Sequence, residues 1–105
     1  MNKTYEKYIQ NGKVAVLYSP GHGAGWYSWN TKHEGLLFDK DIVCAVLAKD
    51  YTLAAKIAEE KYPKCYTGGA DQLQIKWLEV GDWFDIKVND GYEKVIYSSN
   101  SFLEA

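Results

Sequence analysis

Apolar and polar residues alternate in the last third of the chain. Apolar side chains occupy every second position over residues 73–77, and again over residues 84–88. Successive side chains of a strand point to opposite faces of a sheet, so this alternation predicts two half-buried strands. Turn-forming residues at 81–82 and 89–91 bound the second strand, and residues 92–97 form a third. The segment therefore predicts a three-stranded antiparallel meander.

A continuous apolar run at residues 13–18 differs from this pattern. A strand that is apolar on both sides is typical of the interior of a sheet, where both faces are covered. Pro20 stops ladder pairing soon after the run. Residues 4–10 suit either a strand or a short helix, and Asn11-Gly12 predicts a tight turn after them.

Two helices are predicted in the middle of the chain. The first begins at Asp39, a capping carboxylate, and continues to about Lys49. The second is capped by Asp50 or Thr52, and its apolar residues recur at helical spacing. It ends before Pro63, because proline disfavours helical geometry in the residue that precedes it.

The length of the chain limits the number of domains. A chain of 105 residues fits one compact domain, because two halves would each lack a sufficient core. The predicted fold is α+β, a single domain over residues 1–105 with a mainly antiparallel sheet of about four strands and two helices on one face. Residues 1–12 are expected to form an N-terminal arm and residues 98–105 a frayed tail. The apolar runs are too short to cross a bilayer and the first residues lack an apolar signal core, so a cytosolic location is expected.

The chain has 12 lysine residues and no arginine. The formal net charge of −2 argues against direct binding of DNA or of an anionic membrane surface. Without arginine the chain has no planar fork for a phosphate or a guanine. Recognition of a phosphate would have to use lysine, backbone N–H groups or polar side chains.

A glycine-rich loop follows the apolar strand. Gly21, Gly23 and Gly25 alternate there, and such glycines let backbone N–H groups approach a ligand closely. Loops at the carboxyl ends of inner strands are also frequent ligand sites. The spacing is neither the dinucleotide fingerprint nor a Walker A loop. Two interpretations remain open: a ligand loop in which His22 also hydrogen-bonds the ligand, and a tight structural loop that lets the next aromatic residues fold back onto the core.

Trp26, Tyr27 and Trp29 follow this loop. Flat aromatic faces beside backbone donors suit a purine, but they also suit a core edge or a protein interface. Trp26 and Trp29, three residues apart, can share one face of a helical turn. Lys32 is a candidate for neutralising a phosphate. The predicted ligand-binding residues are Gly21, His22, Gly23, Gly25, Trp26, Trp29 and Lys32.

The cysteine and histidine residues do not form a recognisable reactive motif. Cys44 and Cys65 are expected to be reduced, with Cys44 a small core residue and Cys65 more exposed in a turn. The positions of His22 and His33 match no common zinc pattern, and a Cys65–His22 nucleophile pair has no known signature. We therefore predict no catalytic residues, no metal site and no cofactor.

Residues 14–30, VAVLYSPGHGAGWYSWN, resemble a GxGAGWxTW-type motif of small phage and prophage proteins of low-GC bacteria. The resemblance continues through residues 36–43 and 59–86. Ser28 stands where those proteins usually have threonine, and the segment at 83–85 lacks the arginines that they often carry. The resemblance implies a viral or prophage origin and a place in the cytosol of a bacterial host, and it implies no catalytic activity.

Two hypotheses for function follow. In the first, the protein is a non-enzymatic binding protein that captures a small nucleotide-like ligand, such as a host defence signal, through the glycine-rich loop and its aromatic neighbours. In the second, it inhibits a host defence protein, as an anti-CRISPR protein does, through an acidic and aromatic surface. A homo-oligomer, most simply a homodimer, is expected in either case, because a small domain gains by covering exposed aromatic residues and sheet edges.

Overall fold

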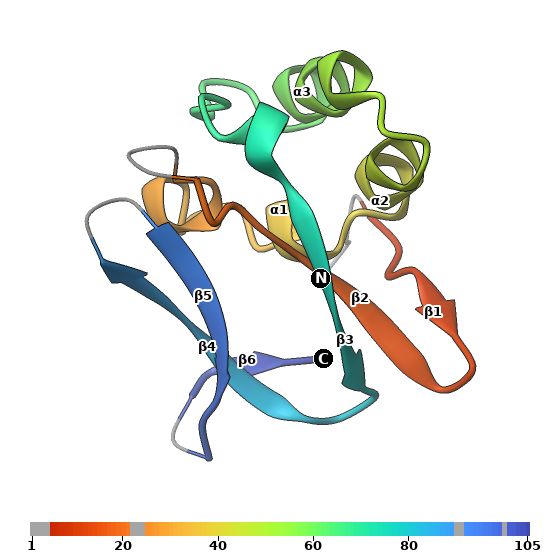
Figure 1. Ribbon diagram of the computed structural model, residues 1–105, viewed down its shortest axis with the longest axis vertical. Coiled ribbons are helices and arrows are strands. Elements are labelled where there is room, and N and C mark those ends of the chain that lie inside the picture. The colour runs from red at the N-terminus through yellow and green to blue at the C-terminus, as the bar shows by residue number, and fades with distance from the viewer. Residues whose placement is uncertain (1–4, 22–24, 90–91, 100) are drawn as a thin grey trace.

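The computed structural model describes residues 5–21, 25–89, 92–99 and 101–105, and it has the α+β fold that the sequence predicts (Figure 1). The elements in chain order are β1 (Ile9–Gln10), β2 (Lys13–Tyr18), the 3-10 turn η1 (Tyr27–Trp29), α1 (Gly35–Phe38), α2 (Lys40–Leu47), α3 (Tyr51–Lys61), the 3-10 turn η2 (Ala70–Gln72), β3 (Gln74–Glu79), β4 (Trp83–Asn89), β5 (Tyr92–Tyr97) and β6 (Leu103–Glu104). The strands form two antiparallel three-stranded sheets, ordered β1-β2-β3 and β5-β4-β6.

β2 is the inner strand of the first sheet, as its continuous apolar run predicts. Val14 pairs with Ile9 of β1 on one side and with Leu78 of β3 on the other. The turn between β1 and β2 uses Asn11 at φ 53° and Gly12 at φ 75°, which are the positive values that a tight hairpin turn requires. Within residues 4–10, the described part contains the strand β1. Of the two predicted alternatives, a strand or a short helix, the strand is therefore the one observed.

β2 also separates two hydrophobic clusters. Ala15 and Leu17 belong to the cluster that contains the buried residues of α2 and α3. Val14 and Val16, on the opposite face, belong to the cluster that contains Phe84 of β4 and residues of the C-terminal segment. Accordingly, α2 and α3 lie on one side of the first sheet and the second sheet lies on the other (Figure 1). The prediction of two helices on one face is correct for α2 and α3.

The starts of α2 and α3 are capped as predicted. The side chain of Asp39 accepts a hydrogen bond from Asp41 N at 2.9 Å, and Asp50 accepts one from Leu53 N at 3.0 Å. Such caps satisfy backbone N–H groups that have no partner inside the helix. The four-residue helix α1 was not predicted, because a single turn shows no repeat of apolar spacing. No helix in the described parts of the chain is both long enough and apolar enough to cross a membrane.

The predicted meander is interrupted between β3 and β4, so the expected single sheet of about four strands is two sheets. The C-terminal strand β6 lies beside the start of β4, where Trp83 pairs with Glu104 and Phe84 with Leu103. Two backbone hydrogen bonds extend this contact, from Gly81 N to Ala105 O at 2.7 Å and from Ala105 N to Asp82 O at 2.8 Å. β6 thus occupies the edge of β4 that β3 would have used.

The frayed tail predicted for residues 98–105 is also incorrect at its end. Leu103 is 7% exposed and Ala105 is 4% exposed, and both pack in the cluster around Phe84. A strand of two residues is too short to show an alternating pattern, so its pairing is not visible in the local sequence.

Candidate functional site

The loop after β2 is organised by a buried carboxylate from the second sheet. Glu93 of β5 is 2% exposed. Its Oε1 accepts a hydrogen bond from Ser19 N at 2.8 Å. Its Oε2 accepts three, from Trp26 N at 2.6 Å, Ser28 N at 2.8 Å and Ser28 Oγ at 2.6 Å. The backbone N–H of Glu93 donates to Ser19 O at 2.9 Å, so both ends of the loop are fastened to this residue.

This arrangement has the chemistry of an anion site that is filled by the protein itself. Backbone N–H groups that converge on one point make an anion-binding concavity. The N–H groups of Ser19, Trp26 and Ser28 converge in this way, and the anion that they hold is the carboxylate of Glu93. These three N–H donors flank the glycine-rich loop, and each already donates a hydrogen bond to Glu93. A second anion beside them would be repelled by the carboxylate of Glu93.

The glycines at the two ends of the loop are in close contact with other side chains. A Cβ on Gly21 would lie 2.5 Å from Cγ of Gln72. Gly25 is buried at φ +55°, and a Cβ there would overlap the indole of Trp29. The positive φ and the contact with the ring both require glycine at position 25, which favours a structural role there. His22 and Gly23 lie outside the described residues, so their predicted ligand contacts stay predictions.

The two tryptophans do not share one face. Trp26 is 0% exposed, and its Nε1–H donates to Leu36 O at 2.7 Å. Trp29 is 63% exposed. The separation arises because Trp26 precedes the 3-10 turn with a non-helical backbone, at φ −135° and ψ −91°. Trp26 is therefore a core residue here and offers no free face to a ligand, whereas the indole of Trp29 does.

Trp29 forms a surface pair with Tyr66, which the sequence did not single out. Their ring centroids are 5.6 Å apart with an interplanar angle of 44°, and Tyr66 is 46% exposed. We call these two residues the aromatic pair. No sequence pattern connects position 29 with position 66, so only the fold brings them together. Lys32, the other predicted ligand residue on this side of the loop, is exposed.

The side chain of Asn30 links the backbone of Trp26 to the backbone of Tyr66. Its Nδ2 donates to Trp26 O at 2.7 Å and to Tyr66 O at 2.8 Å, while its Oδ1 accepts from Tyr66 N at 2.7 Å. Asn30 is 8% exposed; its hydrogen bond to Trp26 O is buried, and its two hydrogen bonds to Tyr66 are partly buried. The aromatic pair is therefore exposed but held in place.

An open cavity borders η1, and neither residue of the aromatic pair lines it. It has a volume of about 460 Å³ and is bounded by η1, β4 and the C-terminal segment, with Tyr27, Asp85 and Phe102 among its lining residues. The side chain of Phe102 is almost fully exposed. Burial raises the pKa of Tyr27, and the nearby carboxylates of Glu34 and Asp85 raise it further. The cavity thus offers a neutral phenol and one carboxylate.

The positions of the two cysteines are the reverse of the prediction. Cys44 is exposed. The buried face of α2 contains Ile42 and Val43, and position 44 lies on the opposite, outer face of the helix. Cys65 is half-buried, and its thiol donates to Ala58 O at 3.6 Å. Burial raises the pKa of Cys65, with a smaller contribution from the charge of Glu59.

Cys44 is expected to react with a maleimide at least about tenfold faster than Cys65 near neutral pH, because the thiolate is the reacting form and a raised pKa lowers its fraction. The rate at Cys65 should rise as the pH approaches that raised pKa. Timed labelling followed by peptide mass spectrometry measures both rates. In a Cys65→Ser variant the fast reaction should persist unchanged. Equal rates, or faster labelling of Cys65, would contradict the assignment of exposure.

Among the described residues, no group of three or more His, Cys, Asp or Glu side chains could hold a metal ion. Comparison of the sequence with protein-family models, with curated proteins and with solved structures found no match.

Proposed function

We propose that this protein is a non-catalytic binding protein that recognises a partner protein through the aromatic pair. The observation that carries the proposal is an exposed Trp29 and Tyr66, with Asn30, the residue after Trp29, joined by two hydrogen bonds to the backbone of Tyr66. Tryptophan and tyrosine are enriched among the residues that contribute most to protein–protein binding. A pair that is already ordered loses little conformational entropy when it is covered.

The buried carboxylate favours this function over capture of a nucleotide-like ligand. A nucleotide would bring phosphate groups to the N–H donors around the loop, and Glu93 already holds those of Ser19, Trp26 and Ser28. A partner protein needs no such donors, because aromatic side chains bind mainly by burying their own apolar area. The exposed indole of Trp29 also suits a planar ligand, so nucleotide capture is the second candidate.

The class of partner follows from the resemblance to phage and prophage proteins. We infer that the partner is a defence protein of a bacterial host and that binding inhibits it. The net charge of −2 and the exposed aromatic residues support a protein partner over a nucleic acid.

Replacing Trp29 with alanine is expected to weaken partner binding by about 2 kcal/mol or more, which is about 30-fold in Kd. Wild type and Trp29→Ala serve as baits in the same bacterial lysate, and quantitative mass spectrometry identifies the proteins that only wild type retains. Calorimetry with the purified partner then gives the two Kd values. Tyr97→Ala is the matched control, because Tyr97 is 66% exposed on β5 and lies outside the aromatic pair.

Two results would contradict the proposal. One is a partner that binds Trp29→Ala as tightly as wild type. The other is a nucleotide that is found by mass spectrometry in the natively purified protein and whose affinity Trp29→Ala lowers. Circular dichroism of each variant separates a loss of binding from a loss of folding.

A further inference from the structure

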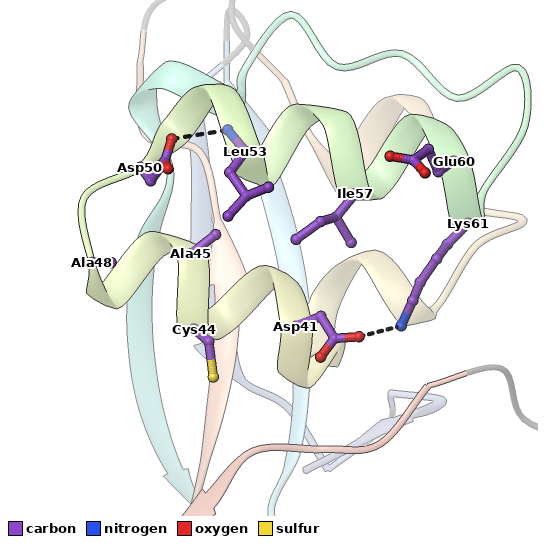
Figure 2. A pocket seen from close by; sticks show the side chains of 9 residues that line it. All are labelled: Asp41, Cys44, Ala45, Ala48, Asp50, Leu53, Ile57, Glu60 and Lys61. Carbon is purple, nitrogen blue, oxygen red and sulfur yellow. Dashed lines mark hydrogen bonds and ion pairs between the residues drawn. The ribbon is translucent and has the colours of Figure 1, made fainter.

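The helical hairpin of α2 and α3 forms a groove on its outer side. The groove has a volume of about 440 Å³, and Figure 2 shows its lining side chains. They are Asp41, Cys44, Ala45 and Ala48 on the α2 side, Asp50 at the turn, and Leu53, Ile57, Glu60 and Lys61 on α3. This surface, which we call the α2–α3 groove, is separate from the aromatic pair, so the inference drawn from it does not rest on the proposed function.

The floor of the groove is apolar. Leu53 and Ile57 point from α3 into the space between the two helices (Figure 2). The α2 wall opposite them is low, because Ala45 and Ala48 have small side chains. Leu53 is 42% exposed, although leucine in a monomeric domain is usually more deeply covered. A low wall beside exposed leucine is the shape that receives the apolar face of another helix.

The rim of the groove carries an excess of negative charge. Asp41, Asp50 and Glu60 supply three carboxylates, and Lys61 is the one lysine among the lining residues. The ammonium of Lys61 is already paired, at 2.8 Å to Asp41 Oδ2 and 3.1 Å to Asp39 Oδ2. The pKa of Lys61 is raised, first by the hydrogen bond to Asp41, so this lysine stays charged and paired at neutral pH. Within the part of the chain that the structure describes, neither Asp50 nor Glu60 forms an ion pair, so both leave negative charge at the rim.

We propose that the α2–α3 groove binds a basic amphipathic helix of a partner protein. The apolar face of that helix covers Leu53 and Ile57, and lysine or arginine side chains beside that face meet the carboxylates of the rim. α3 has 11 residues, which corresponds to a length of about 16 Å, so the bound helix has about three turns. Complementary charge of this kind mainly sets the choice of partner and the rate of association.

A designed peptide tests the charge and the shape together. The probe is a fluorescein-labelled amidated helix of about 14 residues, with leucine at the i, i+3, i+4 and i+7 positions and lysine beside them. The comparison peptide has glutamate in place of every lysine. Fluorescence anisotropy is expected to show saturable binding of the lysine peptide that weakens between about 50 mM and about 300 mM salt. The glutamate peptide is expected to bind at least about tenfold more weakly.

Two charge-reversal variants locate the binding. Glu60→Lys is expected to raise the Kd of the lysine peptide by about tenfold. Glu59→Lys changes the net charge equally, but Glu59 lines a different cavity, so a change of less than about twofold is expected. The lysine peptide should also slow maleimide labelling of Cys44, whose side chain lines the groove. Trp29→Ala should leave peptide binding unchanged, which keeps this test distinct from the test of the aromatic pair.

Several results would overturn the proposal. Equal binding of the two peptides would exclude a basic occupant, and an equal effect of Glu59→Lys and Glu60→Lys would exclude binding in this groove. Unchanged labelling of Cys44 in the presence of saturating lysine peptide would do the same. Self-association of the protein without peptide, detected by analytical ultracentrifugation and abolished by Glu60→Lys, would assign the groove to a second copy of the chain.

Discussion

Replacement of Glu93 by alanine is expected to lower the free energy of unfolding by about 4 kcal/mol. The change removes the acceptor of four hydrogen bonds, and a buried donor without a partner costs about 1–3 kcal/mol. The contributions do not add fully, because the loop can shift and admit water. A domain of this size has a total stability of about 5–15 kcal/mol, so the loss is a large part of it. Urea denaturation followed by circular dichroism measures the change.

A graded pair of variants separates the hydrogen bonds from the volume of the side chain. Glu93→Gln keeps the size but has one acceptor oxygen, so at least one of the N–H donors would face its NH₂ group. Glu93→Gln should therefore lower the free energy of unfolding by about 2 kcal/mol, less than Glu93→Ala does. Glu79→Gln, an exposed change on β3, is the control and should cost less than about 0.5 kcal/mol. If Glu93→Ala lowered the free energy of unfolding by less than about 1 kcal/mol, contacts other than those of Glu93 would hold the loop in place.

Replacement of Asp39 by alanine is expected to cost about 3 kcal/mol. Asp39 is fully buried, caps α2 through Asp41 N, and accepts hydrogen bonds from Lys61 Nζ and from the hydroxyl of Tyr62 at 2.8 Å. Loss of a cap costs about 1 kcal/mol, and the rest comes from the hydroxyl of Tyr62, which loses this acceptor, and from the ammonium of Lys61, which loses Asp39 but retains Asp41. Thermal and urea denaturation give the change in stability.

Asp39→Asn distinguishes these contributions, because asparagine caps a helix as well as aspartate but carries no charge. Its cost should be smaller than that of Asp39→Ala. Wild type should also lose stability at alkaline pH as the pH rises through the raised pKa of Lys61, because the paired ammonium stabilises only the folded state. This alkaline loss should be smaller in Asp39→Asn. The same loss in both proteins would show that Asp39 does not hold the ammonium.

The parts of the fold that the sequence predicted are those that depend on neighbouring residues. Asp39 and Asp50 cap helices within the next three residues, and Asn11-Gly12 makes a turn from its own two backbone conformations. The strand at Lys13–Tyr18 follows from an apolar run. Each signal is complete within a few residues, so local chemistry is sufficient to identify it.

The parts that the sequence did not predict depend on residues far apart in the chain. Trp29 meets Tyr66, and the N–H of Ser19 meets a carboxylate 74 residues later. Glu93 lies between Tyr92 and Lys94 on β5, and in the sequence it resembles any exposed strand glutamate. Its burial is visible only when the second sheet is placed over the loop. The two-sheet arrangement escaped prediction for the same reason, since β6 pairs with β4 through two residues.

The distance along the chain between Ser19 and Glu93 also sets the order of events on a ribosome. At about 5–20 residues per second, the 74 residues that separate them take about 4–15 s to synthesise. During that interval the loop after β2 has emerged but lacks the carboxylate that joins its ends. The surface around Trp29 is therefore completed only after Glu93 has been synthesised, and a nascent or truncated product that lacks Glu93 would not present it in its mature form.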